Sequence, residues 1–197
     1  MTKVIAGATT SLDGFIAGPE ETGFEHLFTW YTAGDVEYQS THPEVPFHLT
    51  PADHAYFSEF LHRVGVFVVG RRLFDLTDGW GGSHPCNKPI VVLTHTVPHE
   101  WIDTHRGAPF TFVTDGIKTA IDTAATIAGD HWVAVNGGEM ARQALEAGLL
   151  QELWVDIAPV LLGGGVPLIG RTDGPVLLED PEIFPGTRVT HLRYRVL

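Results

Sequence analysis

Short runs of apolar residues, uninterrupted by polar side chains, constrain the fold of this chain more than any other feature. Residues 66–69 and 89–93 are such runs, and residues 131–135 form a third after an initial histidine. Runs of this length, rich in valine and isoleucine, are typical of strands buried on both faces of a parallel sheet. Segments of helical period lie between them. This alternation predicts an α/β fold with a mixed, mainly parallel sheet flanked by helices.

The remaining elements are assigned from period and from start and stop signals. Thr50 suits an N-cap, Pro51 suits the first helical position, and Gly65 ends the helix that they begin. We also expect strands over residues 3–9, 110–113, 152–160 and 187–197, and helices from 116 to about 127 and from 139 to 147. The β-rich end predicts antiparallel strands at one edge of the sheet. Residues 18–49 show no sustained period, so they form either a functional loop or short helices.

Length and composition bound the classes of protein that this chain can belong to. No repeat or linker divides its 197 residues, so we predict a single domain over residues 1–197. The net charge of −12 argues against nucleic acid or an anionic membrane as a partner. Cys86 is the one cysteine, and the first residues lack the long apolar stretch of a signal peptide. We therefore expect a cytoplasmic protein with no membrane span.

The 11 histidines raise the question of a metal site. The chain has no H-E-x-x-H pattern and no Cys/His pair at zinc spacing, and Pro98 lies between His95 and His99. We therefore expect no metal. A nucleophile elbow of the G-x-S-x-G type and a phosphate-binding loop that ends in Gly-Lys-Ser/Thr are also missing from the sequence.

Three predicted strands end in residues that suit a ligand. These ends are Gly70-Arg71-Arg72, Thr94-His95 and Asn136-Gly137-Gly138, the last followed by a helix that starts with Glu139 and Met140. Ligands of open α/β sheets sit beyond the carboxyl ends of the strands, so we expect the three ends to share one site. Glycines let a ligand approach the backbone, a helix start offers free N–H groups to a phosphate, and guanidinium groups bind phosphate in pairs of hydrogen bonds. Each motif alone also fits a tight turn or a solvated strand end.

Four segments together resemble a known family. Residues 4–17, VIAGATTSLDGFIA, resemble the opening of the C-terminal domains of riboflavin-biosynthesis deaminase-reductases, which are relatives of dihydrofolate reductase. Residues 69–74, VGRRLF, are similar to the strand-Gly-Arg segment of that superfamily, and residues 135–139, VNGGE, to its Gly-Gly turn. Residues 161–168, LLGGGVPL, are similar to a segment near its C-terminus. The resemblance covers nearly the whole chain in the family's order.

The resemblance implies a dihydrofolate-reductase-like sheet with NADPH across the strand ends. By this analogy Gly70, Arg71 and Arg72 hold the adenosine phosphates, while Thr94 and His95 lie near the 2′-phosphate. The pyrophosphate contacts backbone N–H groups of the turn, which comprises Asn136, Gly137, Gly138, Glu139 and Met140. Ile16 and Ala17 belong to a loop that covers the nicotinamide. Family members are often dimers, so the resemblance also implies a homodimer.

The chain departs from its relatives between residues 19 and 49. Dihydrofolate reductases place a carboxylate on the helix after the cover loop, where it serves proton transfer. This stretch offers Glu21, Glu25, Asp35 and Glu37, of which Asp35 is our predicted catalytic acid. The riboflavin-pathway enzymes show basic groups for a ribose phosphate, whereas this stretch contains Phe24, Phe28, Trp30 and Tyr31. These rings form either the wall of a flat, apolar substrate site or part of the core.

The function that the resemblance implies is that of an NADPH-dependent reductase. Such an enzyme, similar to 5-amino-6-(5-phosphoribosylamino)uracil reductase or dihydrofolate reductase, transfers hydride to a C=N or C=O of a small heterocyclic or sugar-linked substrate. The alternative is a non-catalytic nucleotide-binding member of the same fold. A third possibility is an interaction domain that uses the acidic surface, and the gathering of glycines and arginines at strand ends speaks against it.

Overall fold

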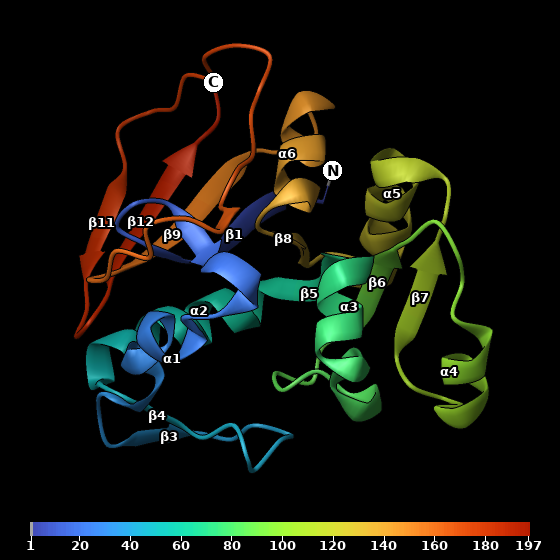
Figure 1. Cartoon of the computed structure of the whole chain (residues 1–197), viewed down its shortest axis with the longest axis horizontal. Helices are drawn as coiled ribbons and strands as arrows, with labels where there is room; N and C mark the ends of the chain where they lie inside the picture. Colours follow the sequence, from blue (N-terminus) through green and yellow to red (C-terminus); the bar gives the residue numbers. More distant parts are fainter. Residues whose placement is uncertain (1) are drawn as a thin grey trace.

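The computed structural model describes residues 2–197 and is built on one eight-stranded sheet with the order β11-β12-β9-β1-β8-β5-β6-β7 (Figure 1). The six strands from β9 to β7 in that order pair in parallel. β12 pairs antiparallel with β9, and β11 pairs antiparallel with β12. The predicted fold class is therefore confirmed, with the antiparallel strands at one edge.

The elements have the following bounds. The strands are β1 Val4–Ser11, β2 Phe15–Ala17, β3 Val36–Tyr38, β4 Phe47–Leu49, β5 Val64–Gly70, β6 Ile90–Leu93, β7 Phe110–Val113, β8 Trp132–Asn136, β9 Glu152–Ala158, β10 Val166–Pro167, β11 Glu182–Pro185 and β12 Thr190–Arg195. The α-helices are α1 Phe24–Leu27, α2 Pro51–Arg63, α3 Arg71–Leu76, α4 His99–Thr104, α5 Gly116–Ala128 and α6 Glu139–Glu146. Three short 3₁₀ helices are η1 Pro19–Glu21, η2 Thr29–Thr32 and η3 Asp78–Gly82.

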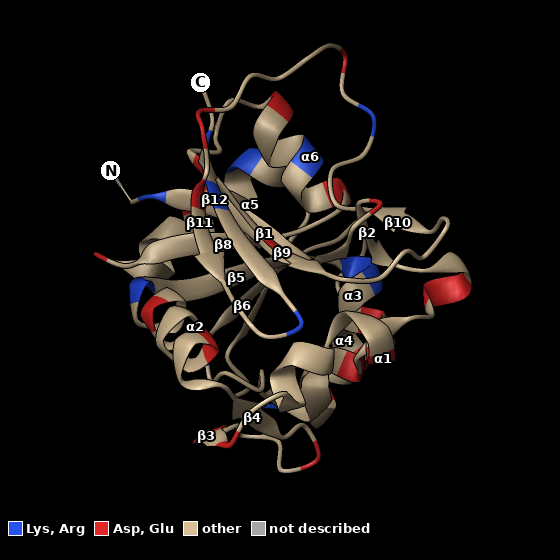
Figure 2. Cartoon of the chain, turned by 90° about the vertical axis from the view of Figure 1, so that its left-hand side faces the viewer, with Lys and Arg blue, Asp and Glu red and all other residues tan. Residues whose placement is uncertain are grey.

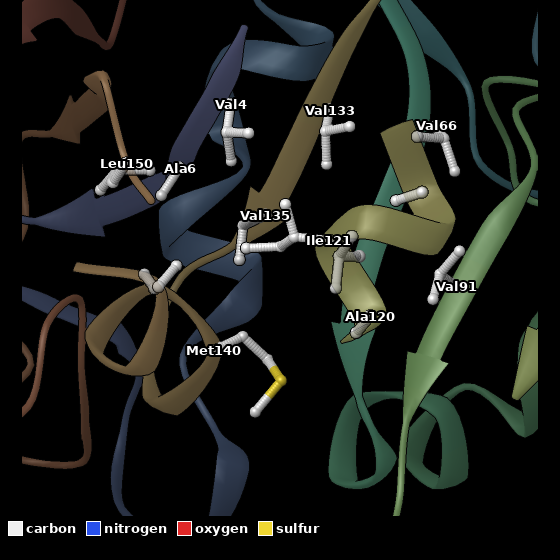
Figure 3. Packing of buried hydrophobic residues seen from close by; sticks show 14 of the residues in the cluster. Val4, Ala6, Val66, Val91, Ala120, Ile121, Val133, Val135, Met140 and Leu150 are labelled. Atoms are coloured by element: carbon white, nitrogen blue, oxygen red, sulfur yellow. The ribbon is translucent and has the colours of Figure 1, made fainter. Parts of the chain in front are cut away.

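The largest core cluster lies between the sheet and helices α5 and α6 (Figure 3). Alternate residues of β1, β5 and β8, including Val66 and Val133, point to this face because successive side chains of a strand face opposite ways. Small residues on the helices, such as Ala120 and Ala141, are fully buried against them. Burial of this apolar surface is what holds both helices on the sheet.

Helix α2 covers the opposite face. Thr50 is its N-cap, and the Thr50 hydroxyl accepts the backbone N–H of Asp53 at 3.3 Å. Tyr56 packs with Ile5 and Trp154 of the sheet in a second cluster. Thus each face of the central strands is buried, which explains their continuous apolar sequences.

Several boundaries differ from the sequence-based prediction. Helix α2 ends at Arg63, so Val64 and Gly65 belong to β5 rather than to the helix. Val64 pairs with Trp132 of β8, and this strand pairing outweighs the helical period that Val64 continues. β9 ends at Ala158, and the C-terminal region contains an edge strand, β11, that the prediction lacks.

The stretch 18–49 consists of short elements rather than of one long loop. It contains η1, α1, η2 and the small hairpin of β3 and β4. Trp30, Phe47 and Leu49 pack with Phe57 of α2 in a cluster of their own. This stretch therefore forms a small extension of the core beside α2. None of the helices in residues 2–197 is both long and apolar enough to span a membrane.

Candidate functional site

The three strand ends expected to share a ligand site lie at one edge of the sheet. β5 is paired with β8 on one side and with β6 on the other, in parallel. The register pairs Val68 with Val135 and Gly70 with Leu93. The loops after β5, β6 and β8 therefore leave the sheet side by side, at the edge where ligands of parallel sheets sit.

The turn between β8 and α6 is held by its glycines. Gly138 has φ +79°, a conformation that residues with a side chain rarely adopt. A Cβ on Gly137 would lie 3.0 Å from the Cβ of Ala8 and 3.4 Å from Cδ1 of Ile16. Ile16 and Ala17 are on β2, so the segment predicted to cover the nicotinamide lies directly over this turn.

Helix α6 begins at this turn with Gly138 as its N-cap and no side-chain cap. The first N–H groups of a helix have no partner within the helix, and its N-terminus carries a partial positive charge. The Glu139 side chain lies along the helix instead, where Arg142 donates to it at 2.8 Å and lowers the pKa of Glu139. Met140 is buried, and its Cγ is 3.4 Å from the position of a Cβ on Gly70. The end of β5 thus lies against the first turn of α6, the helix that follows β8.

The polar side chains at the ends of β5 and β6 divide into two groups. Arg71 donates at 3.3 Å to the hydroxyl of Thr94 and at 2.7 Å to the carbonyl of Thr96, so the structure brings Arg71 and Thr94 together. Arg72 points elsewhere and pairs with Glu21 of η1 at 2.5 Å. His95 is exposed. Figure 2 shows the basic start of α3 close to β2 and β10.

The predicted catalytic acid, Asp35, is exposed on the turn between η2 and β3. Trp30 is only 1% exposed and belongs to the core. Phe24, Phe28 and Tyr31 are half-buried, and their rings stack with centroids 6.2 and 5.0 Å apart. Trp30 is therefore part of the core, whereas the other three rings are exposed enough to line a substrate site.

The triple glycine is anchored against the turn between β1 and β2. The carboxylate of Asp13 accepts the backbone N–H groups of Leu162 and Gly163 at 3.1 and 2.7 Å, and hydrogen bonds lower the pKa of Asp13. The largest of these effects comes from the hydroxyl of Ser11. A Cβ on Gly165 would overlap the backbone of Ala17, so this glycine is required by the close approach of β10 to β2.

A buried polar group on the other face of the sheet was missed by sequence reasoning. The ring of His191 lies between two carboxylates, with Nδ1 2.7 Å from Asp156 and Nε2 3.2 Å from Asp53. These residues come from β12, β9 and α2. The Thr-Pro-Ala-Asp pattern around Asp53 is fully explained as a helix start, so it does not indicate a site. No local sequence signal marks Asp156 or His191. The described residues contain no group of three or more His, Cys, Asp or Glu side chains placed to hold a metal ion.

The sequence matches a known protein family. The family model described as the RibD C-terminal domain matches residues 2–192 of this chain. A protein of Shewanella sp. PV-4 whose name links it to riboflavin biosynthesis is 23% identical with a TM-score of 0.69, and the match covers 100% of this chain and 99% of that one. The riboflavin biosynthesis reductase Rib7 of Saccharomyces cerevisiae is 15% identical with a TM-score of 0.60, over 100% of this chain and 90% of that one.

At such identities the solved structures show a shared fold. The uncharacterized protein YyaP of Bacillus subtilis (strain 168) is 24% identical over 176 residues, which are 84% of this chain and 79% of YyaP. The family model, in contrast, spans nearly the whole sequence. The chain belongs to the RibD C-terminal domain family.

Proposed function

We propose that this protein is an NADPH-dependent reductase that transfers hydride to a C=N or C=O carbon of a small heterocyclic or sugar-linked molecule. One observation carries the proposal. The glycine turn before α6, the uncapped start of that helix and the Arg71–Thr94 pair lie at the same edge of the sheet. This combination suits a dinucleotide, because backbone N–H groups and a guanidinium are the usual partners of its phosphates.

The roles proposed for the residues follow from this arrangement. Gly70, Arg71 and Arg72 would hold the adenosine phosphates, with Thr94 and His95 near the 2′-phosphate. The pyrophosphate would accept hydrogen bonds from the backbone at the start of α6, beside Asn136. Ile16 and Ala17 would exclude water from the reacting atoms. The bound nicotinamide would supply the hydride, and the protein would hold it in contact with the acceptor carbon.

The substrate class is inferred from the half-buried rings and from the family. Phe24, Phe28 and Tyr31 form a stacked, partly exposed series that suits one face of a flat heterocycle. A Thermotoga maritima protein named 5-amino-6-(5-phosphoribosylamino)uracil reductase, and also a deaminase, shares the fold with a TM-score of 0.58 at 14% identity, and the chain spans 57% of that protein. We extend the proposal to a single-domain chain, because one eight-stranded sheet organises the fold. We further propose a homodimer, because the apolar side chains of Val176, Leu177 and Ile183 are exposed.

A titration with NADPH tests the proposal. We expect quenching of tryptophan fluorescence with a dissociation constant in the micromolar range, and weaker binding of NADH. Arg106→Gln is a matched control, because Arg106 pairs only with a neighbouring exposed aspartate on the surface. Failure of the wild-type protein to bind NADPH at micromolar levels would contradict the proposal. Binding without turnover on pterin or ribosylaminopyrimidine substrates would instead favour the non-catalytic nucleotide-binding member.

A further inference from the structure

Three polar residues lie side by side on the face of the sheet that α2 covers. The register pairs Thr9 of β1 with Asp156 of β9, and Asp156 with His191 of β12. His191 is 1% exposed and Asp53 of α2 is completely buried, whereas the side chain of Asp156 is 21% exposed. The series Asp53–His191–Asp156 thus runs from the interior to a carboxylate that is partly exposed.

The contacts of the His191 ring define its chemistry. Both ring nitrogens face carboxylate oxygens, at 2.7 and 3.2 Å. A ring nitrogen beside a carboxylate oxygen needs a proton between the two atoms, so the series holds two protons among three groups. A buried ion pair stabilises a fold weakly, and well-packed apolar residues often do as well. The series is therefore poorly explained by stability alone.

Several elements keep the series in one arrangement. The second oxygen of Asp53 accepts the Thr50 hydroxyl at 2.5 Å and the N–H of Thr187 at 3.2 Å. A Cβ on Gly186 would overlap the carboxylate of Asp53 and lie 3.1 Å from Nε2 of His191. The ring of Tyr56 stacks on one face of the His191 ring, with the ring centroids 3.9 Å apart.

Trp30 completes this enclosure. It meets the His191 ring edge-on at 5.2 Å and donates its indole N–H to Thr9 at 3.3 Å. Two aromatic rings and two carboxylates thus contact the imidazole, and together they hold the ring in place. Such a fixed set of supporting contacts is what a reacting group requires.

The exposed end of the series lies near the rings proposed to line the substrate site. Asp156 is close enough to Tyr31 for its charge to raise the pKa of that phenol, and Thr9, the register partner of Asp156, accepts the indole N–H of Trp30. Two other carboxylates, those of Asp13 and Glu21, already bind other groups. Asp13 accepts the backbone N–H groups of the triple-glycine segment, and Glu21 pairs with Arg72. Asp156 is the carboxylate that combines access with a buried proton partner.

We propose that Asp156 is the catalytic acid of this reductase, and that His191 and Asp53 are positioning residues that keep a proton available to it. The inference rests on the proposed reductase function. A bound reduced nicotinamide would supply the hydride that forms a C–H bond at the acceptor carbon, and the C=N or C=O π electron pair would move to the nitrogen or oxygen. That atom takes the proton of Asp156. The carboxylate is then reprotonated from water at its exposed end.

Two phenols also face this carboxylate. Burial, and secondly the charge of Asp156, raises the pKa of Tyr56, while the nearby Arg193 opposes this shift. Burial raises the pKa of Tyr31 as well, with smaller contributions from Cys86 and Asp156. Both phenols therefore stay uncharged over the ordinary pH range.

The test is Asp156→Asn, assayed with NADPH and two probe substrates, dihydrofolate and 5-amino-6-(5-phosphoribosylamino)uracil. We expect kcat to fall on the order of 100-fold, as for loss of a general acid, while the NADPH dissociation constant stays within about twofold. Wild-type kcat should depend on pH, and the variant should lose this dependence. Asp156→Glu should recover part of the rate, and Asp122→Asn, on an exposed ion pair of α5, should change nothing.

The positioning role has its own readout. His191→Asn should lower kcat about tenfold and alter the pH profile of kcat, because the imidazole no longer holds the carboxylate of Asp156. If Asp156→Asn does not fold, Asp156→Ser replaces it. Wild-type kcat and an unchanged pH profile in Asp156→Asn would overturn this inference and leave the reductase function standing. No turnover of either probe by a wild-type protein that binds NADPH would overturn both.

Discussion

The backbone N–H of Gly138 donates a 2.6 Å hydrogen bond to the carbonyl oxygen of Leu168. This bond ties the glycine turn before α6 to the segment that follows the triple glycine. The same segment forms β10, which pairs with β2 and so holds Ile16 over the turn. The proposed phosphate site and its cover are thus parts of one connected unit.

Gly138→Ala should destabilise this unit. Its φ of +79° is strained for alanine, and the added Cβ would lie 3.4 Å from Cδ1 of Ile16. We expect a loss of about 1–3 kcal/mol in the free energy of unfolding, measured by urea denaturation, and weaker NADPH binding. Gly174→Ala is the control, since its Cβ would meet open space. Equal stability of the two variants would contradict this reading of the turn.

Arg71→Gln should weaken NADPH binding more than it weakens the fold. Arg71 loses its contacts with Thr94, Thr96 and Asp75, which are partly exposed and therefore contribute about 1 kcal/mol or less to stability. Loss of a guanidinium from a phosphate site should raise the dissociation constant about tenfold or more, measured by fluorescence titration. Arg106→Gln should bind as the wild type does. A dissociation constant unchanged in Arg71→Gln would remove Arg71 from the site.

Acidification should destabilise the protein through His84. Burial, with a smaller contribution from His42, lowers the pKa of His84 to about 4. Its Nδ1 accepts the backbone N–H of Cys86 at 3.1 Å, as a neutral imidazole does. Between pH ~6.5, the ordinary value for histidine, and this folded value, the unfolded chain binds a proton that the folded chain does not. Stability contributed by His84 is complete above this window and is lost as the pH falls through it.

The measurement is the free energy of unfolding as a function of pH. The contribution of His84 should amount to at most about 3 kcal/mol. His84→Phe keeps an aromatic ring beside Phe67 and Trp80 and removes the titrating nitrogens. This variant should lose stability uniformly, because Cys86 loses its acceptor, and show a flatter slope in the window. A slope identical to that of the wild type would assign the acid sensitivity to other groups.

Gly7→Ala should be among the most damaging substitutions in the central strands. Gly7 of β1 pairs with Trp154 of β9, and an added Cβ would overlap the backbone carbonyl of Trp154. No rotamer change relieves a clash with backbone, so the two strands must separate. We expect a loss of about 3 kcal/mol in denaturant unfolding. A stability close to that of Gly174→Ala would show that the sheet adjusts without cost.

The central elements could be predicted because their signals are local. Residues 110–113 form β7 as expected, and the run at 66–69 lies within β5. The boundary at Val64 could not be predicted, because Val64 fits both the helical period and the strand that pairs with Trp132. The edge strand β11 has an exposed and irregular sequence that depends on its pairing with β12.

The candidate site, like the fold, could be predicted from the sequence only in part. The glycines and arginines at the ends of β5 and β8 are recognisable from sequence, because parallel strands bring their carboxyl ends to one edge. Their roles toward NADPH remain predictions. The structure finds Asp35 exposed, and we assign the acid role first predicted for Asp35 to Asp156 instead. Trp30 illustrates the limit, because nothing local separates a core tryptophan from one that lines a substrate site.

The sequence by itself determined the central strands and the helices between them, and it determined which strand ends carry glycine and arginine. These properties depend on periodicity and turn chemistry over a few residues. Only the tertiary structure decided that His191 meets Asp156 and Asp53. Their contact depends on β12 returning antiparallel beside β9, and on α2 crossing that face of the sheet. No local pattern encodes such a meeting, because it arises from strand order between residues far apart in the chain.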